Sequence, residues 1–276
     1  MLIIKATGEV VPYDRQKIIY SLQRAGAAEE IIGEVVEETE KHLRDRMHTK
    51  ELYKIVFKKL KKLTRKAAEK YHLKKAIMEL GPTGFPFEKF IAALLESEGY
   101  NTSTNEIVQG RCVAHEVDVI AEKGGKHTFF ECKYHSTNGN ASDIKVALYI
   151  YARYLDIKKN GSNDYDFEDA WLATNTRLTS DAEKYSRCVG LNALSWDYPK
   201  GNSLRERIDR NGLYPITCLT GLPKRQKQLL LDNHVVLCKS INEKPSILKG
   251  IGLSESEKRK ILEQSETICN TSISCK

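Results

Sequence analysis

The spacing of apolar residues divides the chain into a helical beginning, a mixed centre and a helical end. Near the start, extended apolar runs at 2–4 and 10–11 flank a glycine turn, and Pro12 and Asp14 mark the entry to a helix. Up to about residue 80, apolar residues then recur every three or four positions, which is the period of an amphipathic helix. This pattern predicts a small β element followed by four amphipathic helices.

The period changes after the Gly-Pro-Thr-Gly segment at 81–84, where proline and glycine both interrupt a helix. A helix from about Phe87 to Ser97 is expected next, and strands and helices then alternate to about residue 196. The first extended segments span residues 106–108, 113–121 and 127–135, and a glycine turn typical of a β-hairpin joins the last two. This alternation predicts a mixed sheet with helices on both faces.

The two changes of pattern predict three domains, for which a chain of 276 residues is long enough. The expected fold class is α/β, in an α+β multidomain arrangement. Residues 1–80 are expected to form a helical bundle with a small β element, residues 81–218 a mixed sheet flanked by helices, and residues 219–276 a small helical region.

Charge follows the same boundaries, and the whole chain has a net charge of +7. The first segment carries 18 basic and 12 acidic side chains, the second 16 and 19, and the third 10 and 6. Basic ends around an acidic centre favour ends that bind a polyanion and a centre that carries carboxylate chemistry. Ordinary lysine-rich helix surfaces produce the same balance, so charge alone leaves both interpretations open.

Membrane insertion and disulfide bonding are not expected. No run approaches the roughly 18 apolar residues of a membrane span, and the N-terminal stretch lacks a cleavable apolar core. The seven cysteines are an odd number without a CxxC pair, which argues against a disulfide framework and against a zinc cluster. We therefore expect a cytoplasmic protein with reduced thiols.

The candidate chemistry lies in the predicted hairpin. Side chains alternate faces along a strand, so Glu131 and Lys133 share a side, and the hairpin brings Asp118 beside them. Two carboxylates can hold one or two hard divalent cations, while a lysine orients water and offsets charge at a phosphorus centre. The same spacing is also common on a salt-bridged, solvent-exposed strand face.

A series of motifs surrounds this hairpin in a fixed order. They are GFPFEKF at 84–90, HEVDVIA at 115–121, FFECKYH at 129–135, WLATN at 171–175 and SWD at 195–197. Over residues 81–200 the series resembles the PD-(D/E)xK nuclease superfamily, specifically its Mrr-type restriction endonuclease branch. The resemblance implies a DNA endonuclease that uses Mg²⁺ or Mn²⁺ and leaves a 5′-phosphate.

The resemblance also assigns roles to four residues. It implies that Asp118 and Glu131 are metal ligands, that Lys133 is the catalytic lysine, and that Glu88 is an additional catalytic carboxylate near the metal. Many Mrr-type members have glutamine at the position of Glu131. Glu116 shares the strand face of Asp118, and it is either a further ligand or a solvated neighbour.

The first 80 residues resemble a second family. The motifs are IKATG at 4–8, PYDR at 12–15, TKEL at 49–52 and YHLKK at 71–75, and they resemble an ATP-cone, the regulatory nucleotide-binding module of ribonucleotide reductases and their repressors. The resemblance implies phosphate contacts from Lys5, Lys17, Lys75 and Thr49, and contacts to the base or ribose from Ala6, Thr7 and Ile18. Most members have arginine where Ala6 stands.

Adenine nucleotide is expected to act as an effector. The only Gly-Lys pair that resembles the end of a Walker A loop, at 125–126, has Ile120 where the loop requires its first glycine. ATP or dATP bound to the ATP-cone is therefore expected to be an allosteric effector that is not consumed.

Near the C-terminal end, the segment Gly250-Ile251-Gly252 lies between two predicted helices and resembles a helix-hairpin-helix element. Glycine lets backbone amides approach a phosphate, and the next helix begins there. The expected DNA contacts are Lys249, Gly250, Gly252, Lys258 and Arg259. A Gly-Ile-Gly turn is equally common as a plain connection between helices.

These patterns predict a homo-oligomeric, metal-dependent DNA endonuclease that is regulated by ATP or dATP. The alternative is a catalytically silent, nucleotide-sensing DNA-binding regulator. RNA is a third candidate substrate, although the sequence contains no aromatic stacking motif that would recommend it.

Overall fold

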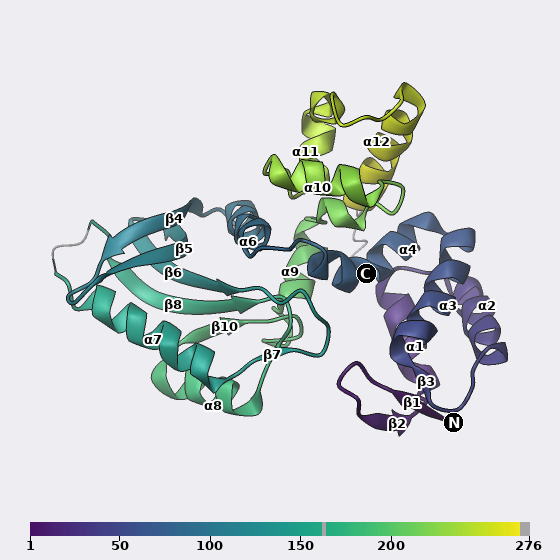
Figure 1. The fold of residues 1–276 in the computed structure, drawn as a ribbon, viewed down its shortest axis with the longest axis horizontal. Coiled ribbons are helices and arrows are strands. Elements are labelled where there is room, and N and C mark those ends of the chain that lie inside the picture. The colour runs from purple at the N-terminus through teal and green to yellow at the C-terminus, as the bar shows by residue number, and fades with distance from the viewer. Residues whose placement is uncertain (162–163, 271–276) are drawn as a thin grey trace. The chain divides into compact units, whose positions relative to one another are not determined.

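The computed structural model of the chain describes residues 1–161 and 164–270 (Figure 1). The fold is mixed α/β, as the alternation of strands and helices predicts. The chain forms two compact units. Unit 1 consists of residues 1–76, 214–229 and the chain from 238 onward, and unit 2 consists of residues 77–213 and 230–237.

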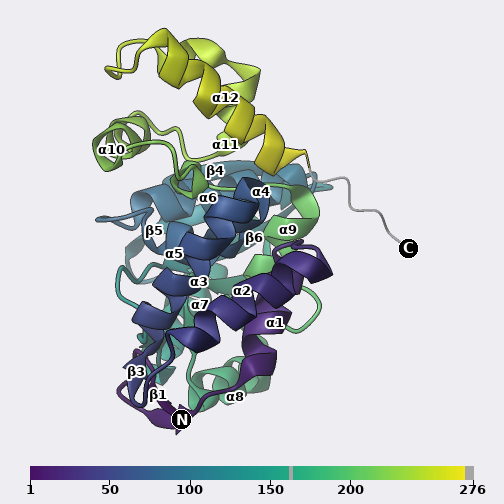
Figure 2. The same cartoon turned by 90° about the vertical axis from the view of Figure 1, so that its right-hand side faces the viewer.

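Unit 1 begins with a small three-stranded sheet in the order β2-β1-β3, formed by β1 (Leu2–Ile4), β2 (Val10–Pro12) and β3 (Met47–His48). β1 pairs antiparallel with β2 and parallel with β3. The helices that follow are α1 (Arg15–Arg24), α2 (Glu29–Lys41), α3 (Thr49–Leu63), α4 (Arg65–Tyr71) and α5 (Leu73–Met78). Figure 2 shows the strands at one end of the helices.

Capping and apolar spacing explain these helices. The Asp14 side chain accepts hydrogen bonds from the first backbone N–H groups of α1, so this helix begins where the sequence predicts. Apolar residues at helical spacing meet in one core, which includes Leu22, Val35, Val56 and Leu60. The last of the four expected helices is broken at His72 into α4 and α5.

The second part of unit 1 contains η1 (Ile216–Cys218), the start of α10 (Lys224–Asp232), α11 (Cys238–Glu243), η2 (Pro245–Leu248) and α12 (Glu255–Cys269). This part packs on the N-terminal helices. Thr217 Oγ1 donates a hydrogen bond of 2.7 Å to the carbonyl of Ala76, and Lys66 Nζ donates one of 3.0 Å to the carbonyl of Asn270. The N-terminal helices and residues 214–270 are therefore in direct contact within unit 1.

Unit 2 is built on a five-stranded sheet in the order β10-β8-β6-β5-β4. The strands are β4 (Asn101–Gln109), β5 (Ala114–Lys123), β6 (Lys126–Lys133), β8 (Phe167–Thr174) and β10 (Asn192–Leu194). β4, β5 and β6 are antiparallel neighbours, whereas β6, β8 and β10 are parallel. The sheet is thus mixed, and β4 begins five residues before the extended segment that the sequence predicts.

Helices cover both faces of this sheet (Figure 1). The helices are α6 (Phe85–Ser97), α7 (Ile144–Lys158), α8 (Ser180–Val189) and α9 (Leu204–Asn211), and a small pair of strands, β7 (Ala141–Ser142) and β9 (Arg177–Leu178), lies beside them. Tyr154 of α7 packs against Phe129 of β6 on one face. Lys89 of α6 bonds Thr104 of β4 at 2.5 Å on the other.

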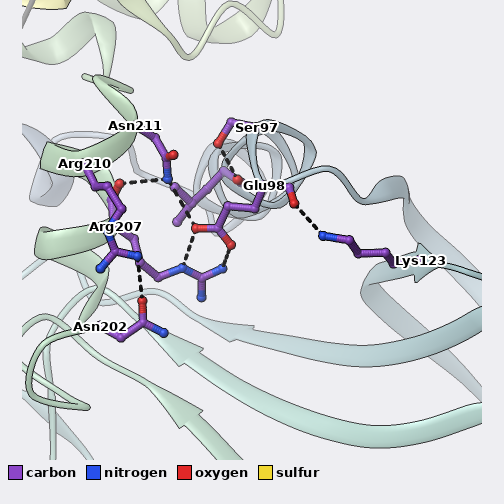
Figure 3. A network of polar contacts seen from close by, with 8 residues as sticks. Ser97, Glu98, Lys123, Asn202, Arg207, Arg210 and Asn211 are labelled. Atoms are coloured by element: carbon purple, nitrogen blue, oxygen red, sulfur yellow. Dashed lines mark hydrogen bonds and ion pairs between the residues drawn. The ribbon is translucent and has the colours of Figure 1, made fainter.

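A buried ion pair fixes the end of α6 (Figure 3). The guanidinium of Arg207 bonds both carboxylate oxygens of Glu98, with 2.8 Å between Nε and Oε1. Asn211 donates to the same oxygen at 3.2 Å, and Lys123 Nζ donates to the Glu98 carbonyl at 2.9 Å. These contacts hold α6 against α9 and β5, and α6 in turn carries Glu88.

Candidate functional site

The β5–β6 hairpin places the central carboxylates. The paired part of the hairpin ends at Val119 and Phe130, and Asp118 and Glu131 are the next residues on the two strands. Asp118 Oδ2 accepts a hydrogen bond of 2.7 Å from the amide of Cys132, and the charge of Asp118 acts on the Glu131 carboxylate. Lys133 lies two positions beyond Glu131 on the same face, with an exposed side chain. The structure therefore brings together the three residues that the sequence singles out.

Asn105 extends this row onto β4. The β4–β5 register places Asn105 opposite Asp118, and its backbone has a φ of 60°. Its Nδ2 donates hydrogen bonds of 3.0 Å to Glu88 Oε2 and 3.4 Å to Glu116 Oε1. Asn105 thus links the carboxylate of α6 to the hairpin. The sequence analysis missed Asn105, whose only signal is that asparagine tolerates a positive φ.

Burial dominates the electrostatics of these carboxylates. Burial, together with the neighbouring charge of Asp118, raises the pKa of Glu131 to about 7. Burial also raises the pKa of Asp118, although Oδ2 accepts a hydrogen bond of 2.7 Å from the Cys132 amide, and it raises the pKa of Glu88. Several desolvated carboxylates side by side favour the binding of a cation.

A cationic side chain, that of Arg153 of α7, contacts the Glu131 carboxylate. Its guanidinium forms an ion pair with Glu131 Oε1 and donates a hydrogen bond to the carbonyl of Glu116. The second oxygen of Glu131 is buried and has no hydrogen-bond partner in the part of the chain that the structure describes. The sequence analysis missed Arg153 as well, because its helix is distant in the chain from the hairpin.

Two side chains fix the backbone around Lys133. Asn175 accepts a hydrogen bond from the His135 amide and donates one to the His135 carbonyl, both at 2.8 Å. Tyr134 donates to the Met78 carbonyl at 2.6 Å and accepts from the Gly81 amide at 2.7 Å. These bonds hold the end of β6 in place and thereby position Lys133.

The donor set suits a hard divalent cation in chemical kind, because it consists of carboxylate oxygens. One of these, Glu131 Oε2, is buried and has no hydrogen-bond partner within the described residues. Across residues 1–161 and 164–270, however, no three His, Cys, Asp or Glu side chains are already arranged around a common metal position. Glu131 is turned toward Arg153, so ligation would require this carboxylate to move.

The predicted nucleotide contacts lie in unit 1. Ile4 pairs with His48 in the parallel β1–β3 ladder, so Lys5 and Thr49, the next residues, are on neighbouring segments. Ala6 and Thr7 are exposed in the turn after β1. Lys5 bonds Glu9 at 2.9 Å.

The other predicted nucleotide contacts are on helices. Lys17 is exposed on α1, and its Nζ lies 3.5 Å from Asp14 Oδ2. Ile18, in contrast, is buried in the helical core. Lys75 has an exposed side chain on α5. All seven predicted positions thus lie in the N-terminal part of unit 1, and their role in binding stays a prediction.

The glycine turn before α12 has the expected backbone. Gly250 and Gly252 have φ values of 82° and 77°. Ser254 caps α12 through a capping box with Glu257, and Glu255 bonds Lys258 at 2.7 Å. Lys249 and Arg259 are exposed. The helix thus begins with two acidic residues, which oppose a phosphate at its N-terminus, and DNA binding here stays a prediction.

Comparison with known proteins identifies both ends of the chain. The ATP cone domain matches residues 1–78, and the domain described as AF1548-like, C-terminal, matches residues 214–269. An uncharacterized protein of Archaeoglobus fulgidus is 36% identical over 179 residues, which are 64% of this chain and 99% of the relative. The chain belongs to the AF1548-like family.

A solved structure supports this membership in the AF1548-like family. The crystal structure of AF1548, a protein of unknown function, is 34% identical and covers 68% of this chain and 98% of its own, with a TM-score of 0.57. The N-terminal ATP cone that the sequence predicts is thus confirmed, and it indicates nucleotide-sensing regulation. The nuclease resemblance of the central segment stays a prediction.

The membrane prediction concerns helices alone. Within the described part of the chain, no helix combines the length and apolar character that crossing a bilayer requires.

Proposed function

We propose that this AF1548-like protein is a metal-dependent DNA endonuclease of the PD-(D/E)xK type, controlled by ATP or dATP at its ATP cone. The observation that carries the proposal is the row of Asp118 and Glu131, with Lys133 on the same strand face and Glu88 tied in through Asn105. Desolvated carboxylates of raised pKa beside a lysine are typical of sites for phosphoryl chemistry.

Each residue has a defined task in this proposal. Asp118, Glu131 and Glu88 would hold Mg²⁺ or Mn²⁺, which when bound polarises a phosphodiester and acidifies a water. Lys133 orients the attacking water and offsets the charge that develops on the phosphoryl oxygens. Asn105 holds Glu88, and Asn175 and Tyr134 hold the strand end that carries Lys133. Cleavage leaves a 5′-phosphate.

The proposed control by nucleotide relies on the packing inside unit 1. The ATP cone contacts the C-terminal helices directly through Thr217 and Ala76, and α4 packs on α12. A change in the cone on nucleotide binding therefore reaches the proposed DNA contacts at 249–259 through one packed unit. The proposal includes a cytoplasmic homo-oligomer, with Lys249, Lys258 and Arg259 contributing sequence-independent phosphate contacts.

Plasmid cleavage tests the proposal. Supercoiled DNA, methylated and unmethylated, is incubated with Mg²⁺ or Mn²⁺ over a range of ATP and dATP concentrations. Lys133→Ala is expected to lower the rate of nicking by about 100-fold or more. Lys126→Ala is the matched control, because this lysine lies on the same strand and bonds Glu168 away from the site. Equal rates for wild type and Lys133→Ala would contradict the proposal.

A catalytically silent, nucleotide-sensing DNA-binding regulator is the second candidate. The pairing of Glu131 with Arg153 favours it, because a guanidinium already neutralises a proposed ligand. This candidate predicts salt-dependent DNA binding that responds to ATP, with no cleavage under any divalent cation. Including RNA as a substrate in the same assay tests the remaining alternative.

A further inference from the structure

Arg153 reaches from the middle of α7 into the carboxylate row. Only 11% of the Arg153 side chain and 16% of the Glu131 side chain are exposed. The guanidinium contacts Glu131 Oε1 and the Glu116 carbonyl. Arg153 Cζ lies 5.3 Å from the centre of the Tyr149 ring. Both members of the ion pair are therefore largely withdrawn from water, and removing charges from water is costly.

The pair does not satisfy the groups that it buries. Within residues 1–161 and 164–270, Glu131 Oε2 has no hydrogen-bond partner, although buried carboxylate oxygens are normally bonded. In the other buried arginine–glutamate pair of unit 2, Arg207 bonds both oxygens of Glu98. The contrast indicates that the geometry around Glu131 is not built for the strongest ion pair that these side chains can form.

A single guanidinium also leaves negative charge uncompensated. Asp118, Glu88 and Arg153 all act on the Glu131 carboxylate, and the two carboxylates oppose its ionisation while the arginine favours it. Tyr149 is 62% exposed and lies on the same helix, so its ring offers the guanidinium a partner on the solvent side. Arg153 can therefore leave Glu131 without losing every contact.

We propose that Arg153 is a built-in counter-cation that competes with the divalent cation for Glu131 and thereby sets the cation concentration at which the site fills. This inference rests on the proposed function, because it requires a divalent cation at these carboxylates. In the absence of that cation, the ion pair with Arg153 holds the Glu131 carboxylate in its position. Binding of the cation displaces the guanidinium toward Tyr149.

Mn²⁺ binding to the full-length protein, measured by titration calorimetry and by electron paramagnetic resonance at pH 8, tests this inference. Arg153→Gln removes the competing charge, so Mn²⁺ is expected to bind about tenfold more tightly than to wild type. Arg153→Lys keeps the charge but cannot bond Glu131 and the Glu116 carbonyl together, so an intermediate affinity is expected. Arg205→Gln is the control, since Arg205 pairs with the exposed Asp197.

The variants separate this inference from the proposed function. One outcome would contradict the inference and leave the proposed metal site supported. In it, wild type binds Mn²⁺, Glu131→Gln abolishes this binding, and Arg153→Gln binds Mn²⁺ no more tightly than wild type, which would show that Arg153 does not compete with the cation. If no variant binds Mn²⁺, both proposals fall. Tryptophan fluorescence reports folding, because the two tryptophans, Trp171 and Trp196, are both in unit 2. If Arg153→Gln does not fold, the Mn²⁺ affinity of Arg153→Lys tests the inference in its place. An affinity of Arg153→Lys equal to that of wild type would overturn the inference.

Discussion

Two ion pairs in the described part of unit 2 join a largely buried arginine to a glutamate, and they differ in how completely the carboxylate is bonded. Glu98 receives both arms of Arg207 and a hydrogen bond from Asn211 (Figure 3). Glu131 receives Arg153 on one oxygen, while its other oxygen has no hydrogen-bond partner among the described residues, and burial together with two further carboxylates raises its pKa to about 7. A fully bonded pair stabilises a fold, whereas a partly bonded pair among carboxylates leaves coordination capacity for another cation.

The largest expected effect comes from breaking the fully bonded pair. Arg207→Met leaves Glu98 without its counter-charge and is expected to destabilise unit 2 by about 3–5 kcal/mol. Urea unfolding monitored by tryptophan fluorescence measures this loss. The same change at Arg153 is expected to cost less than half as much, because Glu131, with its pKa of about 7, takes up a proton readily. Equal losses of unfolding free energy would show that the two ion pairs stabilise unit 2 to the same extent, which would contradict the comparison.

A third buried carboxylate, Glu69 of unit 1, tests what burial does to a carboxylate that no arginine of the described residues hydrogen-bonds. Both of its oxygens are buried and have no hydrogen-bond partner among the described residues, and burial raises its pKa from 4.5 to about 7. Between these two values the folded protein holds a proton that the unfolded chain has lost. The free energy of unfolding therefore falls as pH rises through this window, by about 3 kcal/mol in total.

Glu69→Gln removes this titration. The variant is expected to match wild type at pH 5 and to be about 2 kcal/mol more stable at pH 8. Thermal unfolding followed by circular dichroism from pH 5 to 8 measures the difference. Glu37→Gln, on the exposed side of α2, is the matched control. If the Glu69→Gln curve keeps the wild-type slope, the buried carboxylate is not the origin of the pH dependence.

The smallest expected effect sharpens the description of the Glu98 pair. Asn211→Ala removes a hydrogen bond of 3.2 Å to Glu98 and one of 3.0 Å to the Arg207 carbonyl. Glu98 retains both arms of the guanidinium, so the expected loss is about 1 kcal/mol. The urea midpoint by tryptophan fluorescence measures it. A loss as large as that of Arg207→Met would place the main support of Glu98 on Asn211.

Strand periodicity accounts for the part of the site that the sequence predicts. Alternation along two strands and a glycine turn suffice to place Asp118, Glu131 and Lys133 on one face. The mixed sheet, the Asp14 cap and the N-terminal ATP cone follow from equally local patterns. These features depend on residues that are near each other in the chain or joined by a short turn.

The residues that the sequence analysis missed depend on long-range packing. Arg153 reaches Glu131 only because α7 lies on the sheet. The spacing of apolar residues in α7 predicts which face of the helix is buried, but it does not predict where the end of a long side chain lies. Asn105 acts through a positive φ that no neighbouring residue requires. The start of β4 is rich in polar residues and resembles a loop, so its strand structure depends on pairing with β5.

Unit 1 is made of segments that are separated along the chain, because the chain crosses from one unit to the other after residues 76, 213, 229 and 237. This division determines the order in which unit 1 is assembled. During synthesis the N-terminal helices leave the ribosome long before α11 and α12, the helices that complete unit 1. Unit 2, whose sheet ends at β10, already has its strands by then. The nucleotide-sensing end of the chain therefore reaches its final packing last, and removing α12 would expose the surface of α4 against which it packs.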